Sequence, residues 1–259
     1  MKKLNFDPIP PQPSDLIIIA ARPGMGKTAF MLSIAKNMAI DNNTPTAIFT
    51  LEMSGTQLTN RLLSNVANLE SEAIKEGKLS DDEWIHLNHC TRSVSNAPLY
   101  IDDTAELSIS ELQERARRLV REQGVKLILI DYLQLIKVTD TKADNGNQDV
   151  STITRSLKAL AKELNIPIVA MSMLSRCSGP RDNVRPTLSD LPMSEAIEQD
   201  ADIIGFIHRP EHYSQSPEEA DGNEIRGKAE LIIAKNRNGA VGTIDLRYMP
   251  RYNRFENRE

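Results

Sequence analysis

The run Leu16-Ile-Ile-Ile-Ala-Ala21 is followed directly by Arg22-Pro-Gly-Met-Gly-Lys-Thr28, and a stretch with helical periodicity comes next. A buried strand, a glycine-containing loop and a helix in this order are the context that a phosphate-binding loop needs. Gly24 and Gly26 allow the backbone to wrap closely around phosphate oxygens, while amide groups and the helix N-terminus supply partial positive charge. This stretch predicts a phosphate site at the end of a central strand.

Individual residues of this loop have expected tasks. Lys27 is expected to pair with the β and γ phosphates of a nucleotide, and the Thr28 hydroxyl to ligate Mg²⁺. Ala21 replaces the first glycine of the usual G-x-x-x-x-G-K-[ST] pattern. A glycine-containing helix entry with a solvent-facing lysine is the alternative, and the order of strand, loop and helix disfavours it. The predicted nucleotide-binding residues are Arg22, Pro23, Gly24, Met25, Gly26, Lys27, Thr28 and Asp131.

Two carboxylates follow other apolar runs. Leu127-Ile-Leu-Ile-Asp131 is a predicted strand whose terminal aspartate can hold the water shell of Mg²⁺ opposite the phosphate loop. Glu52 follows another such run and is a candidate general base that orients water. Its alternative role is a helix-start charge beside Ser54, a candidate N-cap. Thr28 and Asp131 are the predicted metal ligands.

Apolar runs and amphipathic stretches alternate along the chain, as in a mostly parallel central sheet flanked by helices. Predicted strands cover 16–20, 47–51, 127–130, 166–171 and 203–207, and predicted helices cover 28–40, 55–67, 109–123 and 150–164. This order places a ligand site at the carboxyl ends of the strands. The polar segments 137–149 and 175–190 follow predicted strands, so they are expected to be loops on that side.

The last part of the chain predicts antiparallel pairing. Residues 229–234 and 243–248 flank Asn238-Gly239, a dipeptide that favours the positive φ angles of a tight hairpin turn. The predicted fold class is therefore α/β with a C-terminal antiparallel hairpin. Residues 14–259 are expected to form one domain, preceded by a poorly ordered segment, 1–13.

Composition and charge exclude several classes of protein. The chain has 259 residues, of which 40% are hydrophobic and 26% charged, so collagen-like, low-complexity and disordered chains are excluded. No apolar run approaches the roughly 20 residues of a membrane span, and the amino terminus lacks the apolar core of a secretory signal. A cytoplasmic protein without a membrane partner is expected. Because the net charge is −5, nucleic-acid binding must come from a local patch.

The cysteines, Cys90 and Cys177, are far apart in the sequence. Neither a disulfide framework nor a structural zinc site is expected from this spacing. His86, His89 and Cys90 lie on one predicted helix without a fourth ligand, so they are interpreted as ordinary helix residues.

The chain resembles the ATPase domain of the bacterial replicative DNA helicase, the DnaB family, from about Pro13 to Phe255. The stretches that carry the resemblance are Ala20-Ala-Arg-Pro-Gly-Met-Gly-Lys-Thr28, Leu51-Glu-Met-Ser54, Ile130-Asp-Tyr-Leu-Gln-Leu135, Arg155-Ser-Leu-Lys-Ala-Leu-Ala-Lys-Glu-Leu164, Ile197-Glu-Gln-Asp-Ala-Asp202 and Lys235-Asn-Arg-Asn-Gly239. This family often has alanine at the position of Ala21. The resemblance implies the RecA-like fold of a P-loop NTPase.

The resemblance also implies an ATP-hydrolysing motor that unwinds DNA during replication as a ring hexamer, with ATP and Mg²⁺ between subunits. One side of that site would consist of Lys27, Thr28, Asp131 and the catalytic Glu52. Lys235 and the finger residue Arg237 would reach across from a neighbour, where Arg237 would stabilise charge on the transferring phosphoryl group. The alternative for Arg237 is a surface arginine beside a turn. The implied partners are single-stranded DNA, a primase and a helicase loader.

Four positions depart from the family. The family has a glutamine that senses the γ-phosphate at the position of Met173, and methionine has no strong donor. The family pattern Asp-Leu-Arg-Glu-Ser-Gly, which contacts single-stranded DNA, is here Asp190-Leu-Pro-Met-Ser-Glu195. Pro192 removes a cation, Met193 replaces a glutamate, and Glu195 adds a carboxylate near phosphates. Weakened DNA binding is therefore expected.

No helical collar or linker helix of the family precedes Ser14, which suggests a fragment or a short relative. The leading hypothesis is a helicase motor. The alternative from another class is a nucleotide-dependent assembly or interaction module that binds ATP without gripping DNA, which the four departures favour. A RecA-like relative in recombination or replication control is a third hypothesis, and the stretches 155–164 and 197–202 disfavour it.

Overall fold

The computed structural model describes residues 11–138, 146–174, 185–192, 194–212 and 227–258. Cys177 and Met193 lie outside the described residues, as do most of segment 1–13 and parts of the loops expected at 137–149 and 175–190. In the described part of the chain, no helix is long and apolar enough to cross a membrane.

One sheet of nine strands, counted over the described residues, has the spatial order β3-β2-β4-β5-β1-β6-β7-β8-β9. The parallel strands are β1 (Leu16–Ala21), β2 (Thr46–Thr50), β3 (Leu99–Asp102), β4 (Leu127–Asp131), β5 (Ile168–Met173) and β6 (Ile203–His208). The antiparallel strands are β7 (Lys228–Asn236), β8 (Gly242–Met249) and β9 (Arg254–Asn257). The predicted α/β class, with a mostly parallel sheet and a C-terminal antiparallel hairpin, is confirmed.

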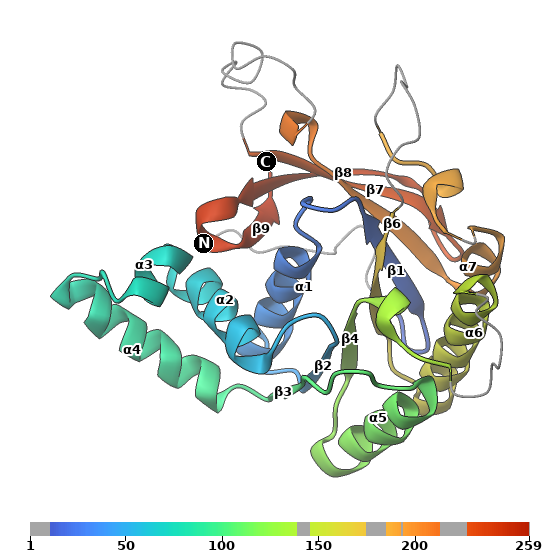
Figure 1. Cartoon of the computed structure of the whole chain (residues 1–259), viewed down its shortest axis with the longest axis horizontal. Helices are drawn as coiled ribbons and strands as arrows, with labels where there is room; N and C mark the ends of the chain where they lie inside the picture. The colour runs from blue at the N-terminus through green and yellow to red at the C-terminus, as the bar shows by residue number, and fades with distance from the viewer. Residues whose placement is uncertain (1–10, 139–145, 175–184, 193, 213–226, 259) are drawn as a thin grey trace.

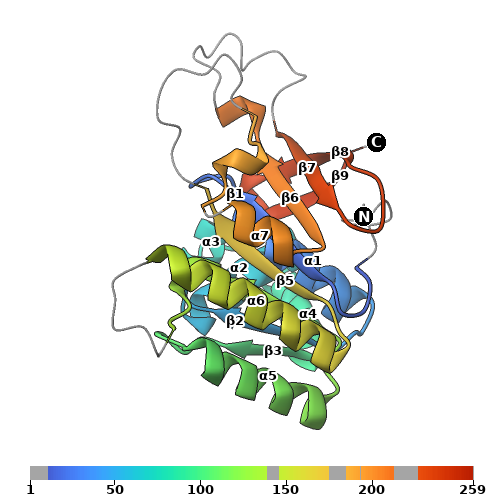
Figure 2. The same cartoon turned by 90° about the vertical axis from the view of Figure 1, so that its right-hand side faces the viewer.

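Helices cover both faces of this sheet (Figures 1 and 2). One side carries α1 (Lys27–Ala35) and α2 (Gly55–Ala67), with α3 (Ser71–Glu76) and α4 (Asp81–Asn96) further out. The other side carries α5 (Ile109–Gln123), α6 (Gly146–Leu164) and α7 (Ser194–Asp200). Alternate residues of β1 belong to the two resulting core layers, with Ile18 in one and Ile19 in the other. Burial on both faces explains why β1 is apolar throughout.

Two helix boundaries differ from the prediction. The α-helix that starts the segment 28–40 ends at Ala35, and a π-helical turn continues from Lys36 to Asp41. The loop predicted over 137–149 is wrong for its last four residues, because α6 begins at Gly146. Apolar periodicity marks only the buried part of a helix, and the predicted start of this helix, Val150, is a buried residue.

His86 and Cys90 lie on α4. The Nε2 atom of His86 donates a 3.0 Å hydrogen bond to the carbonyl of Ala67. The Cys90 side chain is buried in a small cluster with Leu69 and Leu87. Both residues therefore hold α4 against the end of α2.

The hairpin of β7 and β8 forms as predicted, but the predicted turn geometry is wrong. Neither Asn238 nor Gly239 has a positive φ angle. The Asn236 side chain organises the turn instead, because its Oδ1 accepts from the Asn238 amide and its Nδ2 donates to the carbonyl of Ala240. A Cβ atom on Gly239 would lie 2.6 Å from Asn236 Nδ2, so the close approach of this side chain requires glycine.

Candidate functional site

The phosphate loop connects β1 to α1 at the carboxyl edge of the parallel strands. Gly24 and Gly26 have φ angles of +80° and +95°, in the left-handed region that side chains rarely adopt. The carbonyl of Gly26 accepts a hydrogen bond from the amide of Phe30 in α1. Ala21 still belongs to β1, so this position does not need a glycine. This geometry favours an anion at the N-terminus of α1.

A cavity of about 260 Å³ opens in front of the loop. Its lining residues are Pro23, Gly24, Gly26, Lys27, Thr28, Ala29, Glu52 and Met173. Arg22 and Met25 are buried, and the Met25 side chain packs into the core layer that contains α1. The structure thus brings most of the predicted binding residues to one cavity, and directs the Met25 side chain away from it.

Thr28 and Asp131 meet beside this cavity. Thr28 Oγ1 donates a 2.7 Å hydrogen bond to Asp131 Oδ2. Asp131 is fully buried, and its second oxygen, Oδ1, has no hydrogen-bond partner in the described part of the chain. Hydroxyl and carboxylate oxygens are ligands that Mg²⁺ prefers, so this pair fits the predicted metal site.

Burial shifts the pKa values of the charged groups in the site. It lowers the pKa of Lys27, although Asp131 and Glu52 oppose the shift. It raises the pKa of Asp131, opposed by the Thr28 hydrogen bond and by Lys27, and assisted by the negative charge of Glu52. Both directions mean that the charged forms are incompletely solvated. An anion beside Lys27 and a cation beside Asp131 would favour these charged forms.

Glu52 lines the cavity from the segment between β2 and α2. Leu51 donates its amide to the carbonyl of Asp131, which ties the segment to the end of β4. Ser54 caps α2 in a capping box with Gln57. Glu52 stands two residues before that cap, so its exposed carboxylate faces the cavity outside the helix.

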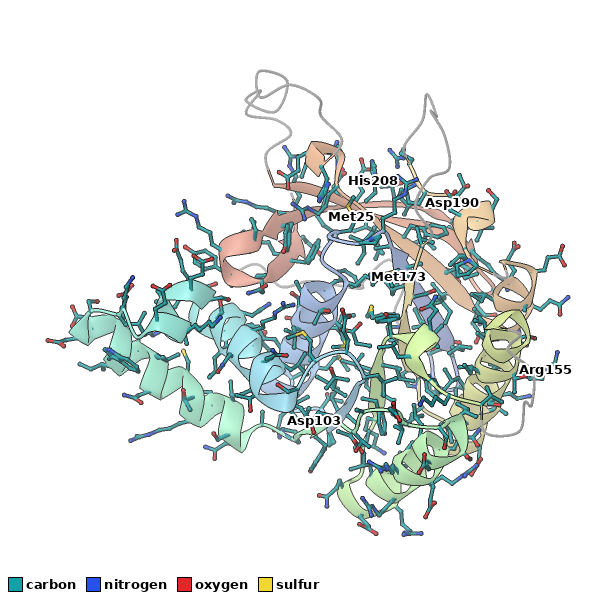
Figure 3. The ribbon with its side chains drawn as sticks, viewed as in Figure 1. Met25, Asp103, Arg155, Met173, Asp190 and His208 are labelled. Carbon is teal, nitrogen blue, oxygen red and sulfur yellow. The ribbon has the colours of Figure 1, made fainter. Side chains whose placement is uncertain are left out.

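Position 173, to which the resemblance assigns a contact with the γ-phosphate, belongs to the lining of the phosphate cavity. Met173 ends β5, and its side chain lies at the cavity (Figure 3). Gln134 fastens this strand end, because its Oε1 accepts from the Met173 amide at 3.2 Å and its Nε2 donates to Ser172 Oγ at 2.9 Å. A thioether at this position cannot donate a hydrogen bond to a phosphate oxygen.

Residues that the sequence did not single out cover the phosphate loop from β6 and β8. Arg209 Nη1 donates a 3.1 Å hydrogen bond to the carbonyl of Gly24, and the guanidinium lies 4.3 Å from the centre of the Tyr248 ring. Glu211 Oε1 accepts from Arg209, and its Oε2 accepts from the amide of Gly227. Tyr248 and Glu211 line a second cavity, of about 430 Å³. This cavity is therefore linked to the phosphate loop through Arg209.

Phe255 of β9 supports the same region. The Phe255 ring packs against Tyr248 with 4.5 Å between ring centres, and a Cβ atom on Gly26 would lie 3.1 Å from it. Of these residues, only Arg209 could have been suspected from the sequence, because it directly follows a buried strand that pairs with β1. No local pattern identifies Tyr248 or Phe255, because pairing of distant strands brings them to the loop.

Lys235 and Arg237 lie near the amino-terminal ends of the parallel strands, whereas the phosphate loop of the same chain lies at their carboxyl ends. Lys235 pairs with Ile204 near the start of β6, whereas the loop follows the end of β1. Lys235 Nζ donates to the carbonyls of Glu198 and Ala201. The site described above therefore lacks both cations within one chain.

The segment expected to contact DNA leads into α7. Leu191 is buried, and Pro192 is half-buried. Glu195 is exposed in the first turn of α7, where a negative charge is favourable at a helix N-terminus. Asp190 and Met173 both lie toward the carboxyl edge of the strands (Figure 3).

A glycine loop between a central parallel strand and a helix, with a threonine and a buried aspartate beside it, defines a P-loop NTPase of the RecA-like fold. The chain belongs to the family of DnaB-like helicase C terminal domains, whose sequence pattern matches residues 10–257.

Relatives of known name support this membership. The chain is 46% identical over 248 residues to the replicative DNA helicase DnaB of Geobacillus stearothermophilus, covering 96% of this chain and 53% of that protein. It is 44% identical over 248 residues to the replicative DNA helicase DnaC of Bacillus subtilis (strain 168), with coverage of 96% and 53%. The chain thus spans about half the length of these curated relatives.

Solved structures agree with the fold. One of them, described as an ATPase domain, has a TM-score of 0.87 and 36% identity, covering 96% of this chain and 86% of that chain. A DnaB-like replicative helicase, described with its interactions with primase, has a TM-score of 0.88 and 36% identity, covering 96% and 58%. These relatives favour a helicase motor over the assembly-module hypothesis.

Proposed function

We propose that this chain is the ATP-hydrolysing motor domain of a replicative DNA helicase. The observation that carries the proposal is the Thr28–Asp131 pair: Thr28 lines a cavity formed with the glycine loop and Lys27, and the buried Asp131 keeps one oxygen, Oδ1, without a partner in the described structure. Thr28 and Asp131 would hold Mg²⁺, directly or through its water shell. That cation would supply Lewis-acid stabilisation of charge on the phosphates.

The residues of the chain divide the remaining work. Lys27 and the amides of the phosphate loop bind phosphate oxygens, because they supply positive charge at the N-terminus of α1. Glu52 is exposed at the cavity and is proposed to orient and deprotonate the attacking water. The cavity lined by Tyr248 and Glu211 is proposed to receive the base, since Arg209 connects it to the phosphate loop.

Arg237 and Lys235 are proposed to act in trans, across an interface of a ring oligomer. Their distance from the phosphate loop of the same chain supports this arrangement, since they lie at the opposite edge of the sheet. A head-to-tail interface would bring this edge of one subunit to the cavity of the next, as closed rings require. The guanidinium would then stabilise charge on the transferring phosphoryl group.

Single-stranded DNA, primase and a loader are proposed partners of the whole helicase. One of the structural relatives is a DnaB-like helicase described with its interactions with primase, which supports that partner. The DNA grip of this chain is proposed to be weak, because Pro192, Glu195 and Met173 remove a cation, add a carboxylate and remove a donor.

A mixing experiment tests the shared site. Lys27→Ala is expected to abolish ATP hydrolysis, and Arg237→Ala to leave only a small, measurable residual turnover. In rings mixed at equal amounts, about one quarter of the interfaces combine an intact loop with an intact finger, so turnover should return to about a quarter of normal. Mixing each variant with itself is the control. Absence of rescue in oligomers shown to contain both variants would refute the shared site.

A further inference from the structure

Asp202 forms a buried junction between three segments of the chain. It follows α7, and only 5% of its side chain is exposed. Its Oδ2 accepts from the amide of Leu16 at 2.8 Å and from Lys158 Nζ at 2.5 Å. Its Oδ1 faces Arg237, with 3.3 Å to Nη1. The two carboxylate oxygens therefore have different partners, and one oxygen faces Arg237.

The same junction holds Arg237 at two further points. The backbone amide of Arg237 donates to the carbonyl of Asp202 at 2.8 Å. Arg237 Nη2 donates to the carbonyl of Gln199 at 2.8 Å. The Arg237 side chain nevertheless stays 46% exposed. It is thus oriented from one side and accessible from the other.

We propose that Asp202 is a positioning residue for Arg237 in the hydrolysis reaction. This inference rests on the proposed action of Arg237 across a subunit interface. A free arginine side chain at a turn samples many rotamers, and ordering it on binding costs free energy. A buried carboxylate fixed by Leu16 and Lys158 orders the guanidinium before the neighbour arrives.

The burial of Asp202 explains why it can do this. Ion pairs between exposed side chains are weak and screened, whereas a buried acceptor with fixed partners keeps its geometry. Lys158 lies on α6, and its side chain is 19% exposed. It binds Oδ2 of Asp202, the oxygen that does not face Arg237. Asp202 does not line the phosphate cavity of its own chain, so its effect on hydrolysis would pass through the residues proposed to act in trans, of which Arg237 is the one that its carboxylate contacts.

The test uses Asp202→Asn in the whole chain. The amide can keep its oxygen toward Leu16 and Lys158 and turn its NH₂ toward Arg237, which removes the ion pair selectively. We expect kcat to fall about 10- to 100-fold, the scale of misplaced catalytic groups, while KM for ATP changes less than about twofold. Glu163→Gln is the control, because it removes another ion pair with an arginine, the 2.7 Å pair of Glu163 with Arg117, away from the Asp202 junction. Its kcat should stay within about twofold of normal.

Two further measurements separate positioning from general damage. In an Arg237→Ala background, Asp202→Asn should lower kcat no further, because the group that it positions is already absent. Rings mixed from Asp202→Asn and Lys27→Ala proteins should regain turnover, because intact phosphate loops then meet fingers with an intact Asp202.

The outcomes distinguish this inference from the proposed function. If Arg237→Ala is rescued by Lys27→Ala but Asp202→Asn is not, the shared site stands and the positioning role of Asp202 is refuted. An equal loss of kcat from Asp202→Asn with and without Arg237 would also refute it. If Arg237→Ala itself is not rescued, the shared site fails, and the inference fails with it.

Discussion

Replacing Asp131 with asparagine should stabilise the free protein and weaken its response to nucleotide. In the absence of ligands, Asp131 is completely buried, and one of its oxygens has no partner in the described structure. Burial raises the pKa of this carboxyl, which means that folding disfavours its charged form. Asparagine has nearly the same shape and can keep the 2.7 Å hydrogen bond from Thr28.

The expected magnitude follows from the cost of a buried, unpaired polar group. This cost is about 1–3 kcal/mol for a neutral group and more for a charged one. Removing the charge while keeping a buried amide should therefore raise the free energy of unfolding by about 1–2 kcal/mol at pH 7. For a chain of this size, that corresponds to an increase in Tm of roughly 2–4 °C.

Nucleotide should reverse the order of the two proteins. A ligand at 100 times its Kd stabilises the folded state by about 2.7 kcal/mol. The native chain should gain this stabilisation from Mg²⁺ and a nonhydrolysable ATP analogue, whereas the Asp131→Asn variant should gain much less. Thermal unfolding with and without ligand measures both effects. Thr28→Val is the matched control, because it removes the remaining partner of Asp131 and should lower Tm.

A lower Tm of Asp131→Asn without ligand would refute the reasoning about the buried charge. An equal ligand-induced rise in Tm for both proteins would refute the assignment of Asp131 to the metal. The two halves of the prediction therefore fail independently.

Three further predictions concern hydrolysis, pH and DNA. Glu52→Gln should retain nucleotide binding and lose turnover, because geometry survives without the carboxylate base; ATP binding and single-turnover rates measure this. Burial lowers the pKa of His208, opposed by Glu230, so the unfolded chain binds the proton first and stability should fall as pH drops through about 6.5, by at most about 1.4 kcal/mol per pH unit. His208→Gln should flatten this fall in denaturant titrations. Salt titrations should show that the chain binds single-stranded DNA weakly and that its affinity depends little on salt concentration. Four substitutions made together should raise the affinity and make it fall more steeply with salt. These are Met173→Gln, Pro192→Arg, Met193→Glu and Glu195→Gly; tight binding by the unaltered chain would contradict the prediction.

The central part of the fold was predictable because its signals are local. Continuous burial makes β1 apolar along its whole length, and β4 and β6 apolar up to their last residues, Asp131 and His208. Gly24 and Gly26 were predictable for a similar reason. Their backbone has positive φ angles, which favour glycine, so the sequence marks these positions by the residue type itself. Local causes such as these leave local patterns.

The region between α2 and α5 was not predictable in the same way. The strand β3 has four residues, all half-buried at the edge of the sheet, so it lacks an apolar run. Only Leu87 and Cys90 of the sixteen residues of α4 are buried, so its apolar face is too narrow to dominate the sequence. These elements bury few side chains against the rest of the protein, so the pattern of apolar residues in their sequence is weak.

The departures at the cavity illustrate how fold and chemistry separate in this family. The backbone at Met173 is held by Gln134 through its amide and carbonyl, contacts that any residue at position 173 can make. The side chain alone faces the cavity, so a methionine in place of the glutamine that the resemblance implies is expected to change the contact to phosphate while the strand remains in place. Glu195 is similar, because its charge suits the N-terminus of α7 although it opposes a nucleic-acid phosphate. The substitutions at both positions are compatible with folding, so the family membership of the chain does not depend on them, whereas the salt titration of DNA binding tests whether they weaken the contact with DNA.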